Sequence, residues 1–174
     1  MVYLAEHGEG PFHKSGPIKN LNVAYNFLPL QFIVLVRQGS EIQNFSDLKK
    51  YKSIMNFGIE GSGLNGTIER ILQELSFNKS DFLESKENLS APKQARALCE
   101  KKLDVIAYVV SEKSTTISSA LNTCPIKLVS FQTNELEKLS TLGYNRAIIQ
   151  ANTYSNQTQP IQTIGLTPQG ITLQ

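Results

Sequence analysis

The sequence has no long apolar run, no surplus of one charge and no cysteine spacing typical of a metal site. Its 174 residues include 17 basic and 15 acidic side chains, which are scattered and give a net charge of +2. This excludes the basic footprint that nucleic-acid binding requires. The longest apolar runs, at 32–36 and 105–110, are too short to cross a membrane as a helix. What remains is ordinary globular material, enough for one domain or one domain with pieces of another.

Cysteine and histidine are scarce. Cys99 and Cys124 form no CxxC motif. They can pair in an oxidising compartment, but we expect two buried free thiols, because free cysteine is among the most buried residue types. His7 and His13 lie in an irregular segment without a nearby cysteine or acid pair, so we expect no metal site there. The first residues have neither the basic nor the apolar region of a signal peptide, so none is expected in this chain.

Apolar runs of strand length alternate with amphipathic segments of helical length. We expect strands at 32–37, 103–110, 126–131 and 146–150, and helices at 64–75, 90–102, 115–122 and 134–142. Strands that alternate with helices of this length predict an α/β fold, in which a parallel or mixed sheet carries helices on its faces.

Both ends of the chain differ from its middle. Residues 1–20 are irregular and rich in Gly and Pro, and residues 147–174 contain no charged side chain. Such stretches form extended or frayed segments more readily than a core. We therefore expect an opening part at 1–31, a compact lobe at 32–150 and a crossing segment at 151–174. The two end parts should be less ordered than the lobe.

A glycine loop precedes the helix expected at 64–75. A short strand is expected at 56–59, followed by the loop around Gly61, Ser62 and Gly63. The first N–H groups of a helix have no partner within it and the helix dipole is positive there, so a carboxylate or phosphate is favoured. The glycines let the backbone approach such an anion, and the serine hydroxyl can cap the helix or bind the ligand. The loop therefore predicts an anion site.

The spacing Gly61-x-Gly63-x-x-Gly66 also matches the dinucleotide-binding fingerprint. Three features argue against NAD. Glu60 would lie beside the pyrophosphate, Arg70 is bulky where close helix packing is needed, and no acid ends a second inner strand. The chain also lacks the lysine of a P-loop. No cofactor is expected.

Nucleophilic catalysis has no better support. Ser62 is not in a nucleophile elbow, because Glu60 and Leu64 occupy the positions that glycine needs in Gly-x-Ser-x-Gly. Ligands of open α/β sheets bind beyond the carboxyl ends of the strands, so the loop at 61–65 and the turn at 111–114 should border one crevice. The sequence thus favours binding over catalysis.

Short motifs follow one another in order along nearly the whole chain. They are Gly10-Pro-Phe12, Gly16-Pro-Ile-Lys-Asn-Leu21, Val36-Arg37, Ser40, Phe45-Ser-Asp-Leu48, Gly58, Gly61-Ser-Gly63, Leu103-Asp104, Asn152-Thr-Tyr154 and Gln162-Thr-Ile-Gly165. This ordered set resembles the TAXI family of solute receptors that feed TRAP transporters. The resemblance implies a periplasmic binding protein of type II, without catalytic activity, whose two α/β lobes close on a small carboxylate such as glutamate, glutamine or a related dicarboxylate. Its partners would be the TRAP membrane subunits.

The resemblance also assigns candidate ligand contacts. Backbone and hydroxyl donors would come from the loop and the helix start, at Gly61, Ser62, Gly63, Leu64 and Asn65. The rim of the cleft would be formed by Gln31, Ser111 and Tyr154. Leu64 departs from the family, which usually has threonine after Gly-Ser-Gly. That change removes one hydroxyl donor.

The opening strand and first glycine-rich loop of the family have no counterpart in this sequence. We therefore expect a second lobe with hinge strands, truncated at both ends, in which residues 1–31 are a remnant of the first lobe and residues 151–174 return to it. An alternative is a surface or secreted interaction protein derived from such a receptor that no longer transports. An enzyme on the same two-lobed fold is the third possibility.

Overall fold

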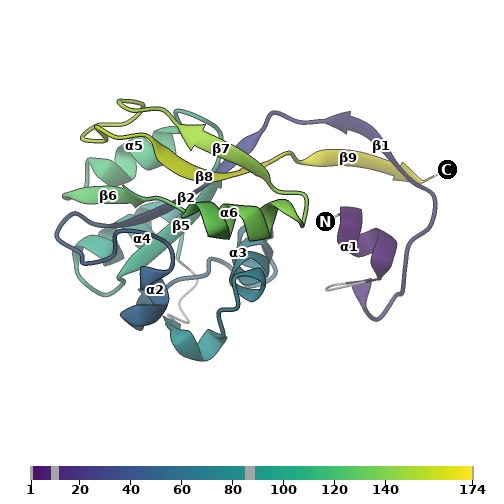
Figure 1. Ribbon diagram of the computed structural model, residues 1–174, viewed down its shortest axis with the longest axis horizontal. Helices are drawn as coiled ribbons and strands as arrows, with labels where there is room; N and C mark the ends of the chain where they lie inside the picture. Colours follow the sequence, from purple (N-terminus) through teal and green to yellow (C-terminus); the bar gives the residue numbers. More distant parts are fainter. Residues whose placement is uncertain (1, 9–11, 85–88, 174) are drawn as a thin grey trace. The chain divides into compact units, whose positions relative to one another are not determined.

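The structure is a computed structural model that describes residues 2–8, 12–84 and 89–173 (Figure 1). The chain divides into two compact units. The larger unit is residues 30–166, and the smaller unit combines residues 1–29 with residues 167–174.

A mixed sheet forms the centre of the larger unit. Its strands, in spatial order, are β4 (Leu83–Glu84), β3 (Ile54–Met55), β5 (Val105–Val110), β2 (Leu30–Arg37), β8 (Ile161–Leu166) and β7 (Asn145–Ile149), and β6 (Ile126–Val129) also pairs with β2. β3 runs parallel to β4 and β5, whereas β2 is antiparallel to β5, β6 and β8. The predicted α/β class with a mixed sheet is confirmed.

The strand β2 is central because its apolar residues are covered on both faces. Phe32, Val34 and Val36 belong to one hydrophobic cluster, and Ile33 and Leu35 to the other. All five are at most 1% exposed. The continuous apolar run thus gives a strand that is buried on both sides, as expected for a sheet between two helical layers.

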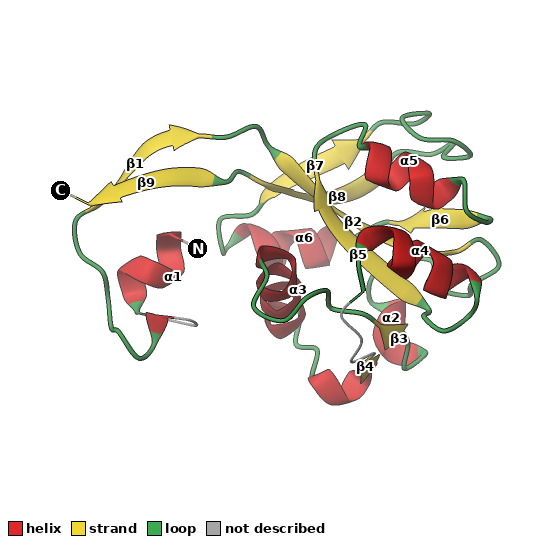
Figure 2. Cartoon of the chain, turned by 180° about the vertical axis from the view of Figure 1, so that it is seen from behind, coloured by secondary structure: helices red, strands yellow, loops and turns green. Residues whose placement is uncertain are grey.

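Helices cover both faces of this sheet. On the face of Phe32 lie α2 (Asp47–Lys50), α3 (Gly63–Glu74) and α6 (Thr133–Ser140), and on the opposite face lie α4 (Ala91–Cys99) and α5 (Thr115–Leu121); a 3-10 turn, η2, spans Lys79–Asp81. Figure 2 shows the second layer from behind. The apolar stripe of α3, with Ile68 and Ile71 fully buried, packs on the first face, which is the placement that its three- and four-residue spacing predicts.

Cys99 and Cys124 form a disulfide. The prediction of two free thiols is therefore wrong. Cys99 is the last residue of α4, and Cys124 follows α5. The usual burial of free cysteine therefore did not predict the state of these two thiols. α4 and α5 pack side by side, which brings Cys99 and Cys124 close enough to bond. A bond that closes 25 residues stabilises a folded chain by roughly 3.5 kcal/mol through the entropy of the unfolded state.

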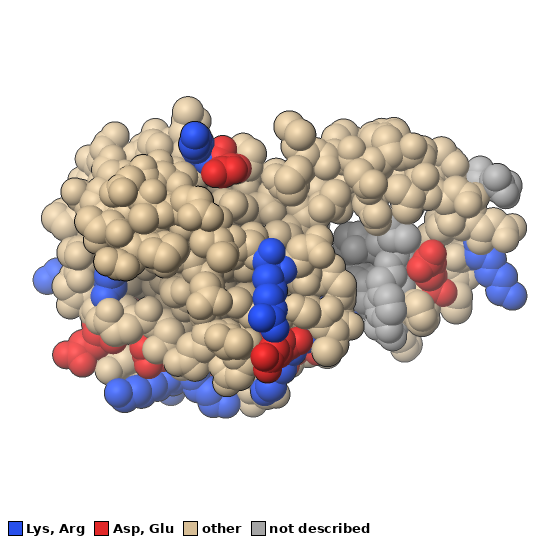
Figure 3. Space-filling view, turned by 45° about the horizontal axis from the view of Figure 1, so that its top comes forward, with Lys and Arg blue, Asp and Glu red and all other residues tan. Residues whose placement is uncertain are grey.

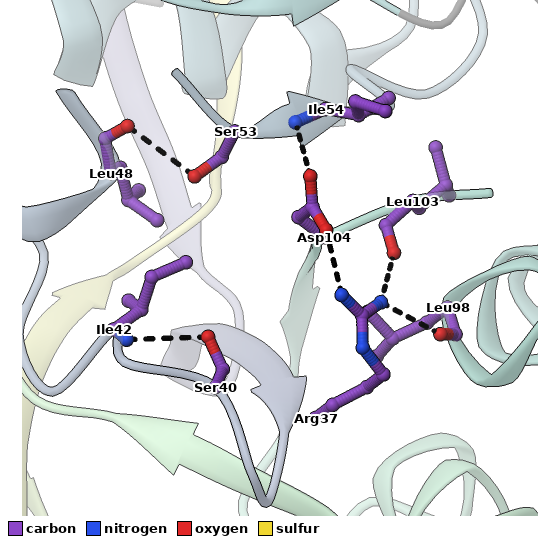
Figure 4. A network of polar contacts seen from close by, with 9 residues as sticks. All are labelled: Arg37, Ser40, Ile42, Leu48, Ser53, Ile54, Leu98, Leu103 and Asp104. Atoms are coloured by element: carbon purple, nitrogen blue, oxygen red, sulfur yellow. Dashed lines mark hydrogen bonds and ion pairs between the residues drawn. The ribbon is translucent and has the colours of Figure 1, made fainter. Parts of the chain in front are cut away.

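A polar network ties the end of β2 to its neighbours (Figure 4). The guanidinium of Arg37 donates to the carbonyl oxygens of Leu98, at 3.0 Å, and Leu103, and pairs with the carboxylate of Asp104 at 2.7 Å. The second oxygen of Asp104 accepts from the Ile54 amide at 2.9 Å. One arginine thereby joins β2, the end of α4 and the start of β5.

Residues 151–166, predicted to be part of the crossing segment, lie in the larger unit. They include β8, which pairs along β7 and with the start of β2. Ile164 is 1% exposed, and the hydroxyl of buried Thr163 donates to the Phe32 carbonyl. The polar sequence of this segment did not predict a buried strand. The burial is possible because the Thr163 hydroxyl has a hydrogen-bond partner in β2. The stretch from Ala147 onward has no charged residue, and much of the face drawn in Figure 3 is uncharged.

The smaller unit contains the helix α1 (Val2–His7) and a two-stranded antiparallel ribbon of β1 (Leu21–Asn26) and β9 (Gln169–Leu173). In the ribbon, Val23 and Tyr25 are 47% and 57% exposed, and Phe27 and Leu28, which follow β1, are 52% and 80% exposed. The Tyr25 ring lies over Gly170, where a Cβ would overlap with it, and meets the Phe27 ring edge-on at 4.9 Å. The lower order expected for the two ends of the chain stays a prediction.

Candidate functional site

The loop before α3 is held by buried side-chain amides. Asn56 is 1% exposed, and its carbonyl oxygen accepts from the Gly58 amide at 3.2 Å and from Gln94 of α4 at 2.7 Å. This bonding turns the chain out of the sheet, so the short strand predicted at 56–59 lies instead at Ile54–Met55. Sequence reasoning missed this pair, although an asparagine two residues before a glycine is a signal for such a turn.

Two glycines of the loop need positive φ angles. Gly58 has φ +79° and Gly61 has φ +75°. Side chains other than glycine rarely adopt this region, so both residues shape the turn. Gly63 does not have a positive φ, and a Cβ at Gly61 or Gly63 would have no atom within 4 Å. The loop therefore leaves open space in front of the helix.

The start of α3 offers unsatisfied donors. Ser62 is the N-cap, and its hydroxyl oxygen accepts from the Asn65 amide at 3.2 Å, which confirms the predicted capping. The Ser62 carbonyl accepts from Gly66 at 3.0 Å. The amides of Gly63 and Leu64 have no hydrogen-bond partner among the described residues. Two backbone N–H groups and a hydroxyl proton can thus bind an anion here.

No basic residue lies close in sequence to this helix start. From Asn56 to Ile68 the sequence has no basic residue, and Glu60 is exposed beside the loop. The side chain of Leu64 packs on the core. A single helix terminus contributes about 0.3 to 1 kcal/mol toward a negative charge. Anion binding by this surface alone is therefore weak.

Gln31 and Ser111 lie together at the carboxyl end of β5. Gln31, in β2, is directly opposite Val110, the last residue of β5, and Ser111 follows as an exposed residue. Gln31 lies two residues before Ile33 in β2, so its side chain points to the same face, that of α4 and α5. Its side-chain oxygen is buried and has no hydrogen-bond partner among the described residues.

Tyr154 is buried, with 5% of its surface exposed. Its hydroxyl oxygen accepts from the Ser114 amide at 3.2 Å. Burial raises the pKa of this hydroxyl, and the Ser114 amide opposes the rise, so the group is neutral at ordinary pH. Tyr154 therefore holds the turn at 111–114 in place and presents little surface of its own to a solute.

The predicted contacts thus fall into two groups. Gly61 to Asn65 come together at the start of α3, while Gln31, Ser111 and Tyr154 surround the end of β5. β3 and β5 are parallel, so both groups lie toward the carboxyl ends of these two strands. However, α3 and α5 pack on opposite faces of the sheet. The crevice bordered by both stays a prediction.

The described residues of the larger unit line cavities away from the loop. One, of about 350 Å³, lies between α4 and α5, and another, of about 450 Å³, lies beside the second half of α3. Neither is lined by residues 61–65. Sequence reasoning missed the groove between α4 and α5, because the small residues that leave it open are spread over two helices.

The described helices include none with the length and apolar character needed to cross a membrane. In the same part of the chain, no three His, Cys, Asp or Glu side chains gather in a way that could hold a metal ion.

Known proteins give one family and several distant likenesses. No curated protein sequence matches the chain significantly. The chain is similar to the periplasmic aliphatic sulphonate binding protein SsuA from Escherichia coli, with 16% identity, a TM-score of 0.46, and coverage of 83% of this chain and 40% of SsuA. The substrate binding protein of an amino acid ABC transporter gives 14% identity, a TM-score of 0.47, and coverage of 95% and 60%.

A third likeness is to ArtJ, the arginine-, lysine-, histidine-binding protein from Geobacillus stearothermophilus, with 13% identity and a TM-score of 0.45. It covers 70% of this chain and 46% of ArtJ. The chain thus spans 40% to 60% of the length of these three proteins. The model of the NMT1-like family matches residues 1–173, so this chain belongs to the NMT1-like family.

Proposed function

We propose that the larger unit is the second lobe of an extracytoplasmic solute receptor of the TAXI type, which captures a small carboxylate for a TRAP transporter. The observation that carries the proposal is the start of α3, where the Gly63 and Leu64 amides and the Ser62 hydroxyl are free to donate to an anion. Glutamate, glutamine or a related dicarboxylate has the carboxylate that such a site takes. The receptor acts by binding, without catalysis.

The contacts divide between chemistry and positioning. Gly61 shapes the turn of the loop. The Ser62 hydroxyl and the amides of Gly63 and Leu64 donate hydrogen bonds to the carboxylate. Asn65 completes the helix start. Gln31 and Ser111 form the rim on the far side of β5, and Tyr154 holds the turn that carries Ser111.

The disulfide supports a location outside the cytoplasm. Disulfides persist in oxidising compartments such as the periplasm and are rare where thiols are kept reduced. The Cys99–Cys124 bond is therefore consistent with a periplasmic receptor whose contact with the membrane is made through the transporter.

The test follows the amide signals of ¹⁵N-labelled chain 1–174 during titration with sodium glutarate. We expect the Gly63 and Leu64 amides to shift without reaching saturation at 50 mM, since one helix end in water gives only about 0.3 to 1 kcal/mol, well below the roughly 4 kcal/mol that millimolar binding needs. Neutral glutaramide is the ligand control and should leave them unmoved. Shifts of equal size with glutaramide, or none with 50 mM glutarate, would remove the anion site.

A pair of variants separates the site from general charge. Gly63→Asp places a carboxylate where the anion would bind, in open space and at a helix start that favours acids, so the fold is retained. Gln73→Glu adds the same charge on an exposed position of the same helix. Only Gly63→Asp should abolish the shifts.

The exposed ribbon of the smaller unit favours a second candidate, a receptor-derived interaction protein. From Asn20 to Val36 the sequence has no charged residue, and β1 exposes two of its apolar side chains by about half. An uncharged strand with an open edge is a template for pairing with another chain. Strong self-association of the chain without any response to glutarate would favour this candidate.

A further inference from the structure

The groove between α4 and α5 has no part in the proposed solute site. It holds about 350 Å³ and is lined by Ala91, Pro92, Ala95 and Arg96 from α4, and by Thr115, Thr116, Ser119, Ala120 and Thr123 from or just after α5. Its floor is formed by small apolar residues and its walls by hydroxyl groups and one guanidinium.

The walls of the groove are held at both ends. Cys99 and Cys124 join the last residue of α4 to the segment after α5. At the other end the Tyr108 hydroxyl donates to the Ala91 carbonyl at 3.0 Å, and Tyr154 accepts from the Ser114 amide. A ligand that enters such a fixed groove loses little free energy to ordering of the protein.

The charge on these two helices is of one sign. From Leu89 to Cys99 and from Lys113 to Asn134 the sequence has four basic residues, Lys93, Arg96, Lys113 and Lys127, and no acidic one. The acids nearest to these segments in sequence are Glu87, Glu100, Glu112 and Glu135. Glu100 already pairs with Lys102 at 2.7 Å, and Glu135 is a buried residue of α6, on the other face of the sheet. The groove therefore favours an acidic ligand.

Several donors in the groove have no partner. The Arg96 guanidinium makes no hydrogen bond or ion pair with the described residues, and its only electrostatic interaction is a weak attraction to Glu100. The hydroxyls of Thr115, Thr116 and Ser119 likewise make no hydrogen bond within the described part of the chain. A guanidinium beside three hydroxyls matches a carboxylate followed by peptide amides and carbonyls.

We propose that this groove is a docking surface for an extended, acidic segment of a protein partner. From Thr115 to Leu121 the groove follows the helix for about 9 Å, at 1.5 Å per residue. An extended peptide of about three residues covers that length. A carboxylate of the segment binds Arg96, its backbone binds the hydroxyls of α5, and its small side chains rest on the alanines.

The probe is an acetylated and amidated five-residue peptide with alternating Glu and Ala, added to ¹⁵N-labelled chain 1–174. We expect saturable shifts confined to the amides of residues 91–96 and 115–123, and binding that weakens with added salt. A peptide with Gln in place of Glu tests the charge. Sodium acetate at the same carboxylate concentration tests whether a free anion suffices.

Two variants and a matched control locate the contact. Arg96→Gln should weaken binding about threefold, the size expected for an exposed ion pair. Ser119→Phe fills the groove from an exposed position and should abolish saturable binding while the melting temperature is unchanged. Lys138→Gln removes the same charge from an exposed position on α6, on the other face of the sheet, and should leave the affinity unchanged.

Four results would overturn the proposal: no saturable shift in the groove, equal shifts with the Gln peptide, equal shifts with acetate, or equal weakening by Arg96→Gln and Lys138→Gln. These outcomes are independent of the solute site, which is read from the amides of Gly63 and Leu64 on the opposite face.

Discussion

The two units use the same kind of strand in opposite ways. β1, and β2 up to its last residue, Arg37, lie in the uncharged stretch from Asn20 to Val36. In the larger unit Phe32 to Val36 are at most 1% exposed, whereas Val23 and Tyr25 in the smaller unit are 47% and 57% exposed. The difference lies in the covering layers. β2 has helices on both faces and neighbours on both edges, whereas within the described residues β1 pairs with β9 alone. Apolar strand character alone therefore does not decide burial.

The contrast also separates the sources of stability. The larger unit combines two apolar clusters, a disulfide and the Arg37 network. The smaller unit has a ribbon of two strands, and two strands by themselves are marginally stable in water. Global stability should therefore depend on the larger unit.

A matched pair of leucine substitutions tests this difference most strongly. Leu35→Ala, at a position with no exposed surface, should lower the free energy of unfolding by about 2 to 5 kcal/mol, because it removes buried methyl groups and leaves a cavity. Leu28→Ala, at a position 80% exposed, should change it by less than about 0.5 kcal/mol. Urea unfolding measures both, and similar losses at the two positions would show that the ribbon shares in the global transition.

The disulfide gives the next largest effect. Replacing Cys99 and Cys124 by serine should lower the free energy of unfolding by about 2 to 4 kcal/mol, since the closed loop no longer restricts the unfolded chain. A reducing agent should weaken the parent by the same amount and leave the double variant unchanged. Two titratable thiols in the untreated parent would show that the bond does not form in solution.

Most of the larger unit could be predicted from the sequence. The runs at 32–37 and 103–110 and the spacing of Ile68 and Ile71 in α3 indicate buried strands and a helix on the sheet, because periodicity reports directly on burial. β8 could not be predicted in this way. Its polar Thr163 is compatible with burial only because a distant carbonyl, that of Phe32, accepts its proton.

The candidate site was predictable only where it is local. The Ser62 cap and the free amides that follow depend on neighbours within four residues, so the sequence is sufficient to predict them. The support of the loop by Asn56 and Gln94 joins residues far apart in sequence. The same holds for Cys99 and Cys124, whose pairing depends on how α4 lies against α5.

A charge added to the exposed ribbon should reduce association of the chain and hardly change its stability. Tyr25→Lys places a charge on the exposed side of β1, which protects open strand edges from pairing. We expect the melting temperature to stay within a few degrees of the parent and any concentration-dependent association, measured by light scattering, to decrease. Ile59→Lys, at a similarly exposed apolar position outside the strands, is the control and should leave association unchanged.

The smallest effect concerns a buried acid on α6 in the larger unit. Glu135 is 6% exposed, and one carboxylate oxygen accepts from the Gln132 amide at 2.7 Å in a capping box. The other oxygen is buried without a hydrogen-bond partner among the described residues. Burial raises the pKa of this carboxyl above its ordinary value, and the Gln132 amide and the neighbouring Ser46 oppose the rise.

A raised pKa means that the folded chain binds this proton more tightly than the unfolded chain does. The resulting contribution to stability is fully present below the unfolded pKa of about 4.5, and it is lost as the pH rises through the folded pKa. Glu135→Gln retains an oxygen for the Gln132 amide and has no charge to bury. Relative to the parent, the variant should therefore gain stability between pH 4 and pH 7, as measured by thermal unfolding across that range. Glu137→Gln, on the exposed side of the same helix, should show no such gain, and an equal gain in both variants would assign the effect to the net charge of α6 instead of to burial.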